Sequence, residues 1–79
     1  MSLSIKQLRY ICAVAEHLHF GRAAEACYVT QSTLSASVQD LEDFLGVPIF
    51  ERTKKHVMVT DKGSELLKRA SRILEDGAD

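Results

Sequence analysis

The chain has 79 residues, of which 46% are hydrophobic and 27% charged, and its formal net charge is −1. This length allows one domain with a single small core, and no apolar run approaches the length of a membrane-spanning helix. The net charge gives no support of its own to nucleic-acid binding, for which a basic domain is the usual sign. The two cysteines lie inside apolar helical patterns, so a reduced cytoplasmic protein fits better than a secreted disulfide scaffold.

A first helix is predicted after Ser4, whose side chain is placed to cap its N-terminus. Ile5, Leu8 and Cys12 repeat at helical spacing, and a second apolar row lies beside them. So wide an apolar surface predicts that this helix packs on two sides, against the next two helices and against a further element.

Residues 20–45 predict a helix-turn-helix, around which the rest of the chain is arranged. The apolar residues of its first helix lie at positions i, i+3, i+4 and i+7, namely Phe20, Ala23, Ala24 and Cys27. Those of its second helix keep helical spacing over three turns, namely Leu34, Val38, Leu41 and Leu45. Residues 27–30 form the turn, and Thr30 occupies the N-cap position of the second helix.

With its apolar stripe turned inward, the second helix directs a polar face outward. Small hydrogen-bonding side chains occupy the first turns of this face, whereas Asp40, Glu42 and Asp43 come later. Because the first turns of a recognition helix reach base edges in the major groove, the pattern predicts a helix that reads DNA. The alternative is an ordinary solvated face whose serines and threonines only cap the helix.

Gly46 and Pro48 end this helix, and two short strands are predicted after it, at residues 49–52 and 57–60. The turn between the strands carries Lys54 and Lys55, which predicts a basic wing placed to contact phosphates. Alone, such a turn would indicate only a soluble hairpin tip. The predicted fold is therefore mainly α: a winged helix-turn-helix of three helices and a two-stranded wing, followed by a long linker helix.

The last predicted helix begins at Thr60 and Asp61 and carries a narrow apolar seam. A narrow seam on the terminal helix of a small domain predicts dimerisation, and the alternative is that the seam packs back on its own domain. The seam consists of Leu66, Leu67, Ala70, Ile73 and Leu74. We therefore divide the chain into a DNA-binding domain, residues 1–60, and a dimerisation helix, residues 61–79, which we expect to be truncated from a longer protein.

The order and spacing of these motifs resemble the N-terminal DNA-binding domain of LysR-type transcriptional regulators. The matching segments cover almost the whole chain, at residues 8–10, 20–24, 29–35, 41–42, 45–47, 49–53 and 59–63. Within that family, residues 19–35 and 50–53 are most similar to the peroxide-responsive OxyR branch. The resemblance implies an activator or repressor that binds imperfect palindromes of double-stranded DNA as a homodimer and forms a tetramer at full length. It also implies a C-terminal domain for sensing an inducer, which this sequence lacks.

The resemblance further implies which residues touch DNA. Those of the recognition helix and its cap are Thr30, Gln31, Ser32, Thr33, Ser35 and Gln39. Those expected to contact the backbone or the minor groove are Arg22, Arg52, Thr53, Lys54 and Lys55. Many members carry a basic residue after the serine that matches Ser35, but here Ala36 follows, so base reading is expected to depend on Gln31 and Thr33.

Other functions compete with DNA binding. The apolar seam and the acids of the recognition helix would also suit a winged-helix module for protein association. A metal site built from Cys12, His17, His19 and Cys27 matches no usual zinc spacing, and both cysteines lie at core positions. The sequence pairs no nucleophile with a plausible base and has no phosphate-binding loop, so we expect no enzyme activity, no cofactor and no metal.

Overall fold

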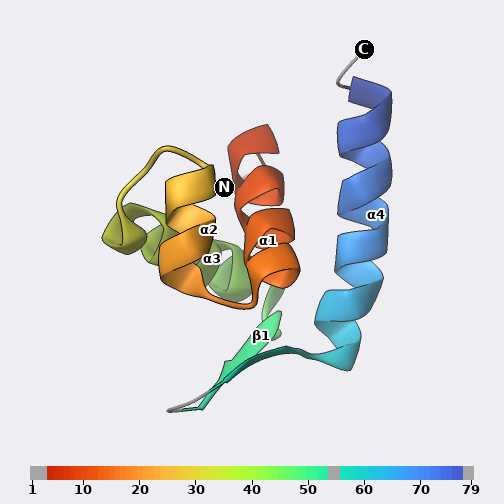
Figure 1. Ribbon diagram of the computed structural model, residues 1–79. Coiled ribbons are helices and arrows are strands. Elements are labelled where there is room, and N and C mark those ends of the chain that lie inside the picture. Colours follow the sequence, from red (N-terminus) through yellow and green to blue (C-terminus); the bar gives the residue numbers. More distant parts are fainter. Residues whose placement is uncertain (1–3, 54–55, 78–79) are drawn as a thin grey trace.

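The computed structural model describes residues 4–53 and 56–77, and these are mainly helical (Figure 1). The elements follow in the order α1 (Ile5–His17), α2 (Phe20–Ala26), α3 (Gln31–Leu45), β1 (Phe50–Arg52), β2 (Val57–Val59) and α4 (Asp61–Gly77). Four helices and a two-stranded antiparallel wing confirm the predicted fold class. Within the described residues, no helix has both the length and the apolar content needed to cross a membrane.

The predicted helix caps are present, because each depends on residues that are close in the sequence. Ser4 accepts the amide hydrogen of Gln7 and the Gln7 side chain accepts that of Ser4, which forms a capping box at the start of α1. Thr30 caps α3 by accepting the amide hydrogen of Thr33. Gly46 ends α3 with a left-handed φ of 75°, a conformation that glycine adopts without strain.

The core lies where α1 meets the helix-turn-helix. α1 packs against α2, α3 and α4, which confirms that its wide apolar surface has neighbours on two sides. Ala23 and Ala24 of α2 are buried, and their small side chains allow the close packing of α2 and α3. The largest fully buried side chains are Ile11, Val14, Leu34, Val38, Leu41 and Ile49. Because Ile49 lies after α3, the chain is anchored in the core immediately before the wing begins.

The wing is a short antiparallel hairpin in which Phe50 lies opposite Val59. Each strand is one residue shorter than the sequence predicts, with β1 starting at Phe50 and β2 ending at Val59. Lys54 and Lys55, which the sequence places in the turn of the hairpin, lie outside the described residues.

α4 runs antiparallel to α1 along the outer side of the domain (Figure 1). It begins at a set of hydrogen bonds to the segment before the wing. The Thr60 hydroxyl donates to the Pro48 carbonyl at 2.7 Å and accepts the Gly63 amide hydrogen at 3.0 Å. A Cβ atom at Gly63 would overlap the Ile49 carbonyl group, so only glycine fits this approach. The first turn of α4 is therefore locked to the residues that lead into β1.

The apolar seam of α4 is divided between the domain and the surface. Ala70 is fully buried within the chain, and Leu66, Leu67 and Leu74 are partly buried against the core. Ile73 remains 48% exposed. Ala70 therefore packs back on its own domain, as in the alternative to dimerisation, and its role in dimerisation stays a prediction.

Candidate nucleic-acid interface

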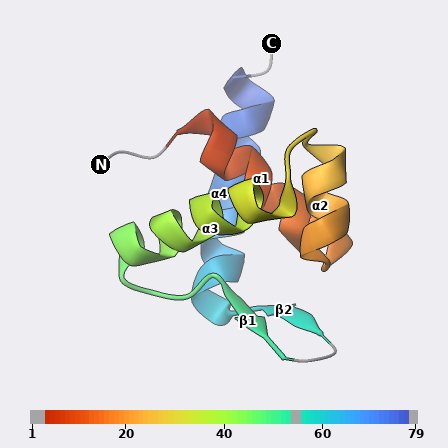
Figure 2. The same ribbon diagram turned by 90° about the vertical axis from the view of Figure 1, so that its left-hand side faces the viewer.

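One face of the domain presents α3 between two other segments (Figure 2). The wing lies on one side of the helix, and the turn that joins α2 to α3 lies on the other side, above the N-terminal end of α3 in this view. α3 itself contains no lysine or arginine among its 15 residues. Any positive charge that attracts a polyanion to this face must therefore come from the neighbouring segments.

The first turn of α3 presents Gln31 and Ser32 to solvent. The Thr30 hydroxyl donates to that of Thr33 at 2.9 Å and lies 3.3 Å from that of Ser32. The Thr30 and Thr33 hydroxyls thus serve the helix cap, while the exposed Thr33 still offers its methyl group, and Ser35 is half-buried. The Gln31 amide, which can donate and accept at once, is the group best suited to a base edge.

A shallow cleft joins the starts of α2 and α3 to the wing. Its polar lining comes from three parts of the chain, in the residues His19, Gln31, Arg52, Thr53 and His56. Gly21 also lines the cleft, and a Cβ atom there would lie 3.3 Å from the Gln31 side-chain oxygen and 3.0 Å from the His19 ring. Glycine at this position leaves space for the Gln31 amide. The structure therefore brings together three predicted residues, Gln31, Arg52 and Thr53, where α3 meets the wing.

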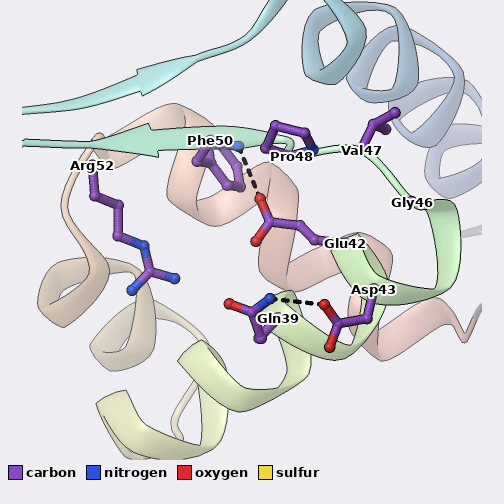
Figure 3. Close-up of a pocket in the computed structure, with 8 residues that line it drawn as sticks. All are labelled: Gln39, Glu42, Asp43, Gly46, Val47, Pro48, Phe50 and Arg52. Atoms are coloured by element: carbon purple, nitrogen blue, oxygen red, sulfur yellow. Dashed lines mark hydrogen bonds between the residues drawn. The ribbon is translucent and has the colours of Figure 1, made fainter.

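Arg52 is held in place by an aromatic pair. Its guanidinium carbon lies 3.8 Å from the centroid of the Phe20 ring, and the Phe20 and Phe50 rings meet edge to face with centroids 6.1 Å apart. Stacking uses the flat face of the guanidinium and leaves the N–H groups on its edge able to donate. Arg52 projects from β1 toward α3 (Figure 3). It therefore ties the wing to α2 and directs donors toward the interface.

Of two further predicted contact residues, Thr53 uses its side chain within the chain, whereas Arg22 is bonded only through its backbone. Thr53 closes the hairpin, because its hydroxyl donates to the His56 carbonyl at 3.2 Å and accepts the His56 amide hydrogen at 3.0 Å. Arg22 is exposed at the start of α2, and its backbone amide donates to His19 Nδ1 at 3.0 Å. The Arg22 bond is backbone only, so its guanidinium group is not engaged by it.

The C-terminal half of α3 holds the wing (Figure 3). One oxygen of Glu42 accepts the amide hydrogens of Ile49 at 2.7 Å and Phe50 at 3.2 Å. The Gln39 amide, predicted to contact DNA, donates to Asp43 at 3.0 Å within the same helix. Two carboxylates also line this end of the interface, and they repel phosphate. Gln39 therefore lies at the less favourable end of α3 for a DNA contact.

The residues weighed as metal ligands are placed as ordinary core and surface side chains. Across residues 4–53 and 56–77, no group of three or more His, Cys, Asp and Glu side chains is gathered closely enough to hold a metal ion. Cys12 and Cys27 are free, partly buried thiols. Burial raises the pKa of both, opposed at Cys12 by a hydrogen bond with Ser71. Both thiols are therefore mainly protonated at neutral pH.

The sequence does not predict four features of this face: the His19 cap, the space above Gly21, the stacking of Arg52 on Phe20 and the role of Glu42. Only the cap has a local signal, since His19 stands three residues before Arg22, where a side-chain acceptor satisfies a helix N-terminus. The other three depend on how separate elements of the fold pack against one another.

Comparison with known proteins gives consistent matches. A family model described as "Bacterial regulatory helix-turn-helix protein, lysR family" matches residues 5–64. The DNA-binding transcriptional dual regulator OxyR of Escherichia coli (strain K12) is 45% identical over 74 residues, which are 94% of this chain and 24% of that protein. The HTH-type transcriptional regulator IlvR of Caulobacter vibrioides is 54% identical over 65 residues, 82% of this chain and 22% of that protein.

The chain therefore spans about a quarter of the length of the curated relatives that it matches. Among solved structures, the CbnR_DBD–DNA complex is similar with a TM-score of 0.91 and 36% sequence identity. That match covers 96% of this chain and 87% of the CbnR_DBD chain, so the likeness extends over the whole winged helix-turn-helix and α4.

Proposed function

This chain belongs to the lysR family of bacterial regulatory helix-turn-helix proteins, and from that premise we propose how it binds DNA. It is the DNA-binding domain of a regulator rather than an enzyme, which sets aside the alternative of a module for protein association alone. We place the first turns of α3 in the major groove and the wing along the neighbouring backbone and minor groove. The observation that carries this placement is the cleft in which Gln31 of α3 meets Arg52 of the wing.

The two sides of that cleft supply different parts of the binding. Gln31 can pair through two hydrogen bonds with adenine, and the Thr33 methyl group can contact that of thymine. Arg22, Arg52, Lys54 and Lys55 supply cations for phosphates, and such contacts release counterions and provide most of the affinity. Since α3 carries no cation, base reading and electrostatic attraction are assigned to separate elements.

Anisotropy titrations of a labelled duplex test this proposal. The specific site is first located by footprinting on genomic DNA, and the protein is then titrated against that site and a random duplex at several salt concentrations. We expect tighter binding to the specific site, and for both duplexes the logarithm of the binding constant should fall linearly with the logarithm of salt concentration. Binding that is absent, or equal for the two duplexes at every salt concentration, would contradict sequence-specific recognition.

We also propose that α4 is the dimerisation helix and that Ile73 lies at the centre of its contact, with Leu66, Leu67 and Leu74 beside it; residues 78–79 of the predicted helix lie outside the described residues. Ile73 is half-exposed on a helix whose other apolar residues are partly covered, so a second copy of α4 would remove its side chain from water. Two copies bound in this way fit an imperfect palindrome, and a full-length protein would add a sensing domain and a tetramer. Sedimentation of Ile73→Asp should show loss of the dimer, and an unchanged dimer would contradict this role.

We further propose that the longer protein acts in the cytoplasm and regulates the response to peroxide. The similarity to OxyR supports this proposal, although IlvR matches a shorter segment at higher identity. Genome-wide footprinting distinguishes the OxyR-like assignment from an IlvR-like one. Binding sites concentrated upstream of peroxide-induced genes are the expected result, and sites that ignore those genes would contradict the peroxide assignment.

A further inference from the structure

The turn between α2 and α3 holds an aromatic side chain almost entirely in solvent. Tyr28 is 94% exposed, whereas the other exposed large apolar side chains of the described residues reach at most 57%. Tyrosine usually covers part of its ring and uses its hydroxyl group to bond a partner, as in protein interfaces. A ring left in water at the edge of a binding face therefore points to contact with a ligand.

The backbone of Tyr28 is also held in an unusual conformation. Its φ is 59°, in the left-handed region that favours glycine and asparagine. Hydrogen bonds fix this turn, from the Tyr28 amide to the Glu25 carbonyl at 3.1 Å and from the Val29 amide to the Ala24 carbonyl at 3.0 Å. Glycine would form the same turn without strain, so a tyrosine here is better explained by what its side chain does.

The position of this turn identifies the partner. The turn and the wing lie on opposite sides of α3 (Figure 2). A helix in the major groove has a phosphate backbone on each side of it, and the wing serves only one of them.

We propose that Tyr28 contacts a phosphate of the DNA backbone on the side of the major groove opposite the wing. The Tyr28 hydroxyl donates its hydrogen to a phosphate oxygen. This inference rests on the proposed function, because it requires α3 to lie in the groove. It gives a recognition helix without lysine or arginine backbone contacts on both sides.

Tyr28→Phe and Tyr28→Gly test the contact in the intact chain. Tyr28→Phe removes only the hydroxyl group, and we expect about tenfold weaker binding to specific and random duplexes alike, because a phosphate carries no sequence information. Tyr28→Gly should weaken binding at least as much without lowering the thermal midpoint, since glycine relieves the left-handed backbone. Phe44→Ala is the matched control: it removes another exposed aromatic ring, at the opposite end of α3, and should leave affinity unchanged.

Phosphate ethylation interference then assigns the contact to one strand. The parent protein should be blocked by ethylation on both sides of the groove, and Tyr28→Phe should lose only the site opposite the wing. An unchanged pattern and affinity in the Tyr28 variants, with normal binding by the parent, would overturn this inference alone. A loss confined to the specific duplex would replace the phosphate contact by a base contact and overturn it too. A parent chain that shows no salt-dependent binding would refute the proposed function and this inference together.

Discussion

At its N-terminal end α3 presents Gln31 and Ser32 to solvent, whereas at its C-terminal end Glu42 and Gln39 are bonded within the protein. Arg52 lines the pockets at both ends, and the second pocket also carries two carboxylates. We call the first the reading end, for its proposed function, and the second the holding end. The difference teaches that polar residues on a recognition helix do not all have the same function, because Glu42 positions the wing whereas Gln31 and Ser32 are exposed to solvent.

Gly63→Ala should have the largest effect, because it displaces the segment between the holding end of α3 and the wing. The added methyl group overlaps the Ile49 carbonyl, and both backbones are fixed by the hydrogen bonds of Thr60. We expect the free energy of unfolding to fall by about 3 kcal/mol, measured by urea denaturation. Ser64→Ala, at the next and exposed position, should change it by less than about 0.5 kcal/mol, and equal effects of the two changes would contradict the close approach.

Glu42→Ala removes the acceptor that holds the start of the wing. Two backbone amides lose their partner, so we expect the free energy of unfolding to fall by about 2 kcal/mol. Affinity for a random duplex should also fall, although the change removes a negative charge from the interface. Asp43→Ala removes the same charge without releasing the wing, and its affinity should stay equal or rise. If both variants bound DNA more tightly, Glu42 would act only through its charge.

Gln31→Ala tests the reading end. We expect the protein to lose about 1–3 kcal/mol of binding energy on the specific site and to relax its preference at one base position, with no change in stability. The measurement is anisotropy on the parent site and on duplexes altered one base pair at a time. An equal loss on specific and random duplexes would show that Gln31 does not read a base.

Lys54→Gln should have the smallest effect, because it removes one positive charge from the wing and leaves both ends of α3 unchanged. Removing a wing lysine that contacts a phosphate should weaken binding to every duplex alike and lower by about 1 the slope of log affinity against log salt concentration. Lys68→Gln, at an exposed position in the middle of α4, removes an equal charge farther from the wing along the chain and should leave that slope unchanged. A loss of preference between sequences in Lys54→Gln would assign base reading to the wing.

The features that could be predicted from the sequence are those that depend on residues close together in the chain. The caps at Ser4, Thr30 and Gly46 follow from side chains within a few positions, and the structure has all three. The order of the helices, the turn and the wing follows from apolar spacing and from the matched motifs. Gln31 and Arg52 are predicted as DNA contacts from the family resemblance, and the structure brings both to one cleft.

The remaining features depend on which distant segments meet. Glu42 reads as one more acid near a helix end, and only the folded chain brings it to the amide of Ile49. Ala70 reads as part of a seam, but the packing of α4 on α1 encloses it. Tyr28 gives no signal at all, since tyrosine is not a residue that predicts a left-handed turn.

The hydrogen bonds of Thr60 tie the wing to the helix that is proposed to set the dimer axis. Each wing would then rotate together with its own α4, so the proposed dimer would hold its two wings in a fixed angular relation. DNA completes a turn in about 10.5 base pairs, and paired half-sites face the same side of the duplex only at matching separations. An insertion of about half a turn between the half-sites would place one of them out of reach. For the proposed dimer, the length of the spacer would therefore be as much a part of the recognised site as the bases themselves.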